Sequence, residues 1–106
     1  GVLAGKQLEL LKETIPKLSR VAVLWNPQNG GSTQVWKESQ PPAKELGLQL
    51  FSMAVNSAND IESGFRDSVT VRSGALFVTG GGLIARNHKR IISLAIKNLL
   101  HGDSWS

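Results

Sequence analysis

Apolar and polar residues follow one another along the chain in blocks that predict strands and helices in turn. The segment from Val21 to Trp25 is wholly apolar and rich in β-branched residues, as in a strand buried on both faces. Leu48–Val55 and Ala75–Thr79 are the other predicted strands. Because helical segments separate the strands, we expect right-handed crossovers and a parallel sheet. The predicted fold is α/β, a flavodoxin-like three-layer sandwich whose short sheet has the order 2-1-3, with strand 21–25 at its centre.

Apolar residues spaced three and four apart predict helices before and between these strands. The first helix covers Lys6 to Leu18, with Pro16 interrupting its last turn. The second covers Ser32 to Leu46, and we expect Pro41-Pro42 to kink it or to split off a second short piece. Gly47 stands where a left-handed C-cap is expected.

Two further helices are predicted in the second half of the chain. One begins at Asp60, acting as its N-cap, and closes at Gly74. The longest helix covers Leu83 to Leu100, with His88 on or beside its apolar stripe, where we expect a half-buried histidine rather than a ligand or a base. The tail His101–Ser106 shows no pattern of helix or strand.

A polar turn follows each predicted strand. Asn26-Pro27 ends the first strand because proline has no N–H for the ladder, and Ser32 can cap the helix beyond. The carboxyl ends of parallel strands meet at one edge of the sheet, which is where open α/β sheets bind ligands. We therefore expect three loops to gather there: Asn26–Ser32, Asn56–Asp60 and Thr79–Leu83.

These loops carry hydrogen-bonding groups but no side chain suited to proton transfer near neutral pH. They contain no histidine, lysine or arginine, and Asp60, their single carboxylate, is expected to cap a helix. The prediction is a binding domain that is not an enzyme and uses neither cofactor nor metal. A receiver domain would need a phosphorylatable aspartate at a strand end, where this chain has Asn26, Asn56 and Thr79. Trp25, at the tip of its strand, either stacks on a ligand ring or seals the core.

Gly80-Gly-Gly82-Leu-Ile-Ala85 satisfies the pattern G-x-G-x-x-A between a predicted strand and a predicted helix. A dinucleotide site also needs an acidic residue at the end of the next strand, and no predicted strand precedes Asp103. We prefer a Gly-rich turn that lets the backbone approach a ligand or a partner lobe. A small nucleotide-binding domain is the first alternative, and a regulatory module whose sheet edge binds a partner protein is the second.

Composition and charge exclude several classes of function. The 106 residues, 41% hydrophobic and 19% charged, are ordinary for one globular domain. The absence of cysteine excludes disulfides, thiol catalysis and cysteine-based zinc sites. No apolar run is long enough to cross a bilayer, and the first residues show no signal-peptide pattern. The net charge of +4 is scattered, and its one cluster, Arg86–Arg90, has no interleaved aromatic residues, so we expect no nucleic-acid partner.

Four stretches resemble, in order, the ABC transporter substrate-binding protein family that includes tryptophan- and tyrosine-binding members. They are Leu3–Pro27, Ala43–Leu50, Gly74–Val78 and His88–Ala95, and the first is the most specific. Family members are secreted and have two α/β lobes of the type I periplasmic-binding fold, with a ligand held between them. The resemblance implies that the chain is a single α/β domain forming part of the second lobe of a longer, periplasmic or extracytoplasmic protein.

The resemblance also implies what the domain binds and where. The solute would be small and polar, such as an amino acid, and an ABC permease would be the partner of the parent protein. The family's ligand-facing loops match Asn26, Asn29, Ser32, Asn56, Ser57, Thr79 and Gly80. The family has a fourth strand where this chain has His101–Ser106, so the edge of Ala75–Val78 would be open and a homo-oligomer could form through it.

Overall fold

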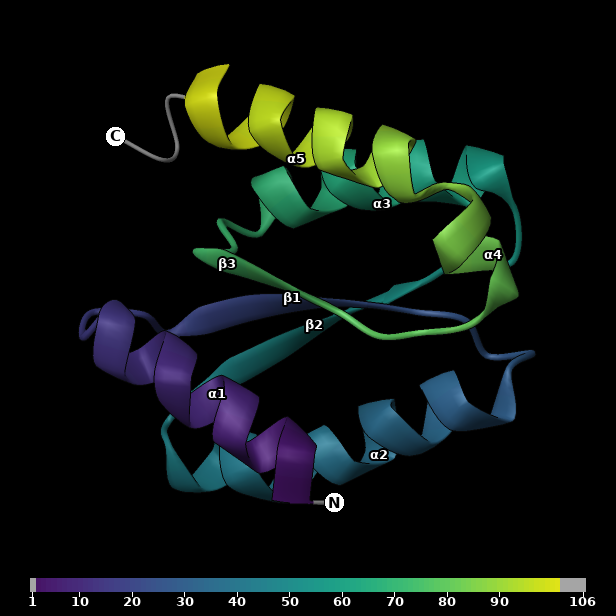
Figure 1. Cartoon of the computed structure of the whole chain (residues 1–106). Coiled ribbons are helices and arrows are strands. Elements are labelled where there is room, and N and C mark those ends of the chain that lie inside the picture. The colour runs from purple at the N-terminus through teal and green to yellow at the C-terminus, as the bar shows by residue number, and fades with distance from the viewer. Residues whose placement is uncertain (1, 102–106) are drawn as a thin grey trace.

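A computed structural model describes residues 2–101 (Figure 1). The Asp103 position and most of the tail therefore lie outside the described residues. The elements, in chain order, are α1 Val2–Thr14, β1 Arg20–Trp25, α2 Gly30–Glu45, β2 Gln49–Ala54, α3 Ala58–Thr70, β3 Ala75–Val78, α4 Gly82–Arg86 and α5 His88–His101.

The strands form one parallel sheet in the order β2-β1-β3, as predicted. β1 pairs with β2 from Arg20↔Gln49 to Trp25↔Ala54, and with β3 from Val21↔Ala75 to Leu24↔Val78. Val21 to Leu24 are at most 1% exposed, because helices cover both faces of the central strand.

Helices lie on both sides of the sheet, which makes the predicted three-layer sandwich. In Figure 1, α1 and α2 lie below the sheet, and α3, α4 and α5 lie above it. Alternate residues of β1 divide between two apolar clusters, with Val21 and Val23 facing α1 and α2, and Ala22 and Leu24 facing the other helices. The buried members of the first cluster are Ala4, Leu8, Leu18, Val21, Val23, Ala43, Leu48, Ala75 and Phe77. Those of the second are Ala22, Leu24, Met53, Val55, Ile61, Phe65, Ile84 and Ile91.

The first helix lies further toward the N-terminus than the sequence predicted. It ends at Thr14, ahead of Pro16, and a turn in which the Leu18 amide donates to the Ile15 carbonyl (2.9 Å) leads into β1. Ile15 lies just past the end of the helix and is 38% exposed. Leu18 is buried, but it belongs to the segment between the helix and β1. The 3.6-residue spacing thus identified Leu8 and Leu11, which pack in the core, but not the residue at which the helix stops.

The expectation that Pro41-Pro42 would leave a separate helical piece is wrong. α2 is one helix from Gly30 to Glu45 with both prolines inside it. Each proline removes its own N–H donor, but the helix continues past both, and the Leu46 amide donates to the Pro42 carbonyl (3.0 Å). Gly5 of α1 lies against Pro42, since a Cβ added there would be 3.6 Å from the proline Cβ. This contact holds the prolines within the α1–α2 layer. Gly47 follows at φ +72°, as predicted for the cap.

The third helix begins and ends before its predicted limits. Its N-cap is Ser57 rather than Asp60, whose carboxylate instead accepts a hydrogen bond from the Asn56 amide (2.8 Å). The helix ends at Thr70, and the residue in the left-handed region is Arg72 (φ +57°) rather than Gly74. Gly74 has a different role, because a Cβ there would lie only 2.8 Å from Leu18 Cδ1.

The long C-terminal helix predicted from Leu83 is two helices, α4 and α5, separated at Asn87. The Asn87 side chain donates to the Leu83 carbonyl (2.8 Å), and its own carbonyl accepts from the Ile91 amide (2.9 Å). Asn87 therefore ends one helix and begins the next. His88 is exposed at the start of α5, not half-buried as the apolar stripe suggested.

Candidate functional site

The predicted site lies at the carboxyl edge of the sheet, and its first loop joins β1 to α2. Asn29 is the N-cap of α2, and its side-chain oxygen accepts a hydrogen bond from the Ser32 amide (2.8 Å). Ser32 was predicted to be the cap; it lies instead in the first turn of the helix. Its hydroxyl oxygen accepts from the Asn26 amide (2.8 Å), which folds the turn back on the helix.

Ser32 and Thr79 join the loops after β1 and β3. Their hydroxyl oxygens are 2.6 Å apart, and both residues are buried, at 1% and 8% exposed. The Thr79 hydroxyl donates to the Leu24 carbonyl (2.8 Å), so the Ser32 hydroxyl must supply the proton shared between the two side chains. The resulting chain of hydrogen bonds begins at the Asn26 amide and ends at the Leu24 carbonyl. Both hydroxyl protons are used inside the protein.

Asn29 also contacts the glycine turn after β3. Gly81 has φ +114°, and a Cβ there would lie 3.0 Å from Asn29 Cγ. The first and third loops are thus in contact through two pairs, Ser32 with Thr79 and Asn29 with Gly81. The run of three glycines in the sequence indicated a close approach of the backbone at this turn. It did not indicate that Gly81 is the glycine involved, or that Asn29 is the residue it contacts. Gly80 is exposed and has open space around its Cα.

The second loop reaches the same sheet edge because β2 pairs along β1, and the Val55 amide donates to the Trp25 carbonyl (2.8 Å). Asn56 and Ser57 are both exposed. The Ser57 side chain makes no capping hydrogen bond, although the residue is the N-cap of α3. Among the described residues neither its hydroxyl nor the Asn56 side chain makes a hydrogen bond, so both are open to solvent.

The structure separates the seven predicted site residues into three groups. Ser32 and Thr79 are buried and brace the loops, whereas Asn56, Ser57 and Gly80 are exposed at the edge. Asn26 and Asn29 are intermediate, with their side-chain oxygens used by the Gln28 and Ser32 amides. A groove of about 400 Å³ between α1, α2 and the end of β3 is lined by Thr79 and Gly80.

Trp25 contributes to the packing at this edge. Its ring stacks on Trp36 of α2, with centroids 5.2 Å apart and planes 8° apart, and its Nε1 donates to Ser52 Oγ (2.8 Å). One ring face and the only polar atom of the side chain are therefore occupied by the protein. Trp25 thus packs against the first core cluster, as one of the two interpretations of the sequence expected.

The groups that the described residues place at this edge are neutral hydrogen-bond donors and acceptors, and no metal site accompanies them in the described range. Within residues 2–101, no three histidine, aspartate or glutamate side chains gather as metal ligands would. Nor is any helix in that range long and apolar enough to cross a membrane.

A three-layer α/β domain with neutral polar loops at the carboxyl edge of its sheet is typical of small-molecule binding proteins. The family model described as ABC transporter substrate binding protein matches residues 2–98, and the chain belongs to that family.

A solved structure described as an ABC domain in complex with L-Trp, from Streptococcus pneumonia, has a similar fold. It superposes with a TM-score of 0.76 and 26% sequence identity over 86% of this chain. The match covers 31% of that structure's own length, so the chain spans less than a third of it. Among curated proteins, no match was found.

Proposed function

We propose that this chain forms part of one lobe of a solute-binding component of an ABC import system, and that the loops at the carboxyl edge form one wall of the ligand cleft. The observation that carries the proposal is the family match over residues 2–98. The parent protein would work outside the cytoplasm and deliver its solute to an ABC permease. Binding and release would be its only task, without catalysis.

The chemistry of the edge favours a small polar solute such as an amino acid. The first-turn amides of Gly30 and Gly31 have no partner inside α2, and a 16-residue helix presents its positive end there, which suits a carboxylate. Asn56, Ser57 and Gly80 add neutral donors and acceptors for an ammonium or amide group. The L-Trp found in the structural relative belongs to the same chemical class.

The seven residues that the sequence suggested as ligand-binding have two different roles in this proposal. Because both of their hydroxyl protons are used internally, Ser32 and Thr79 act as braces that set the distance between two loops. Asn26, Asn29, Asn56, Ser57 and Gly80 are then the residues we propose to meet the solute.

Saturation-transfer NMR with L-Trp tests the proposal on the chain as it stands. One lobe supplies only part of the contacts, so we expect binding with a Kd of about 1 mM or weaker. Asn26→Ala should weaken it about fivefold or more, through the loss of one hydrogen bond to a polar ligand. The control is Gln40→Ala, exposed near the other end of α2, which should change nothing.

The same experiment with NAD or ATP tests the nucleotide alternative. A Kd of about 1 μM that is abolished by Gly82→Val would replace the transport proposal with the nucleotide one. This variant should still fold, because the nearest atom to a Cβ at Gly82 is the end of the flexible Arg86 side chain, 3.0 Å away.

A further inference from the structure

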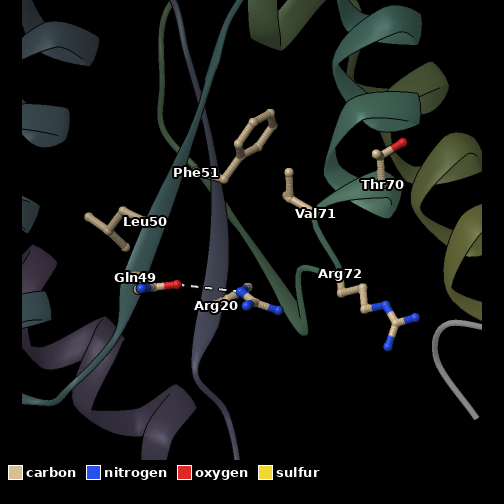
Figure 2. Close-up of a pocket in the computed structure, with 7 residues that line it drawn as sticks. All are labelled: Arg20, Gln49, Leu50, Phe51, Thr70, Val71 and Arg72. Atoms are coloured by element: carbon tan, nitrogen blue, oxygen red, sulfur yellow. Dashed lines mark hydrogen bonds between the residues drawn. The ribbon is translucent and has the colours of Figure 1, made fainter.

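A pocket of about 450 Å³ opens at the amino end of the sheet, opposite the proposed solute edge (Figure 2). It lies between the first residues of β1 and β2 and the end of α3. Its lining is Arg20, Gln49, Leu50, Phe51, Thr70, Val71 and Arg72. The volume is within the range of small-molecule sites in proteins.

The pocket combines an apolar surface with two cations. Figure 2 shows Phe51 and Val71 facing the same space, with Arg20 below Phe51 and Arg72 at the lower right, its side chain running away from Val71. Phe51 is half-buried and Val71 is 37% exposed, so part of each remains accessible. An aromatic ring beside an accessible aliphatic side chain suits the apolar body of a ligand.

Neither arginine is neutralised within the described part of the chain. The ion pairs there are Lys6–Glu9 and Glu62–Arg90, and Arg20 makes only one long contact, from Nε to Gln49 Oε1 (3.4 Å). The backbone carbonyls at the end of α3 accept hydrogen bonds from backbone amides and not from these arginines. Backbone amides of residues 71, 72 and 73 donate to the carbonyls of residues 67, 69 and 68. Both guanidinium groups therefore have donors to spare.

The backbone at Arg72 is in a conformation that glycine or asparagine usually adopts. Its φ of +57° lies in the left-handed region, which is unfavourable for a residue with a long side chain. Stability alone would favour glycine after the end of a helix. The arginine thus keeps a charge beside the pocket at a conformational cost.

We propose that this pocket binds a small organic anion, a carboxylate or phosphate group carried on a flat apolar body. The anion would lie between Arg20 and Arg72, and the body against Phe51 and Val71. This site is separate from the proposed solute cleft, because the carboxyl ends and the amino ends of the strands are at opposite edges of the sheet. It would therefore bind independently of any solute there.

The test is a titration of the backbone amide NMR spectrum of the chain with phenyl phosphate, benzoate and benzamide. The two anions should shift the amide resonances of residues 49–51 and 70–72 with a Kd of about 1–10 mM. Added salt should weaken the binding of both anions. Benzamide has a similar shape without the charge, and should bind at least threefold more weakly.

Arg72→Gly separates binding from folding. The variant removes the charge and relieves the left-handed backbone, so its melting temperature should equal or exceed that of the parent chain. Anion binding should nevertheless weaken about three- to fivefold. Arg66→Gln, which removes one charge from the same helix outside the pocket lining, should leave binding unchanged.

Three results would overturn the anion site. They are the absence of any shift at these amides, equal binding of benzamide, and an equal loss of binding in Arg66→Gln. The last would mean that net positive charge, and not the arginine pair, attracts the anions.

Discussion

At the scale of single residues, the hydroxyl groups of Ser32 and Thr79 link the first and third loops of the proposed site by a hydrogen bond. Each is buried and each proton has an internal acceptor. Buried hydroxyls that are fully hydrogen-bonded stabilise a structure modestly, but losing one partner leaves the others without theirs.

Ser32→Ala should therefore lower the free energy of unfolding by about 1–3 kcal/mol, since it leaves the Asn26 amide and the Thr79 hydroxyl oxygen short of a partner. Urea denaturation measures the loss. The matched control is Ser57→Ala, which removes an exposed hydroxyl that caps nothing and should cost less than about 0.5 kcal/mol. Equal losses in the two variants would contradict the bracing role.

Residue types were predictable from the sequence, but residue roles were not. The turn after β1 was correctly expected to hold a helix cap, yet the cap is Asn29 and Ser32 lies within the helix. What makes Ser32 a brace is its 2.6 Å contact with Thr79, 47 residues away. A local sequence pattern cannot predict a contact between residues so far apart in the chain. In the same way, an arginine two residues past a helix gives no hint that its φ is positive.

At the scale of elements, strands were easier to predict than helix ends. β1 is buried by both helical layers, so its apolar run was unambiguous. Helix ends depend on weaker and competing terms. Asn87 interrupts the last helix through its own side chain, and two prolines fail to interrupt α2. In both cases, tertiary packing or a single hydrogen bond outweighed the propensity.

The C-terminal end of α2 carries an element-scale prediction. Gly47 has φ +72°, so Gly47→Ala should cost about 1 kcal/mol of unfolding free energy through backbone strain. Gly30→Ala is the control, because Gly30 has no positive φ and nothing within 4 Å of an added Cβ. Thermal denaturation of both variants checks the pair. A loss at Gly30 as large as that at Gly47 would show that added bulk, and not the left-handed conformation, is responsible.

At the scale of the whole molecule, β3 is an edge strand with little protection. Among the described residues it pairs only with β1, and Ala75–Val78 contains no charge or proline. An apolar groove of about 310 Å³ runs beside it, lined in part by Leu10 (60% exposed) and Val78 (40% exposed). Such edges favour pairing with another chain.

We predict that the chain self-associates through this edge. Sedimentation equilibrium should give a mass that rises with concentration above the 11.4 kDa of one chain. Val78→Lys should return the mass to that of a monomer, because a charge on an edge strand opposes pairing. Val71→Lys, at a similarly exposed residue beside β2, should not. A monomer at high concentration in the parent chain would refute the prediction.

The whole-molecule expectations from sequence were accurate for the fold because alternating apolar segments leave few topologies open. The family resemblance was equally informative, and the match over residues 2–98 confirms it. Neither could show the pocket at the amino end of the sheet, since Arg20, Phe51 and Arg72 come together only when β1, β2 and the end of α3 are assembled.

The central claim is that the carboxyl edge of the sheet meets a small polar solute. The most direct measurement is the backbone amide NMR spectrum of the chain titrated with L-Trp to about 20 mM. We predict progressive shifts at the amides of residues 26, 28–32, 56–57 and 79–81, whether or not the amides of residues 49–51 and 70–72 also respond to the carboxylate and ring of L-Trp. No shift in any of the three loops, or shifts confined to the amino end of the sheet, would contradict the claim.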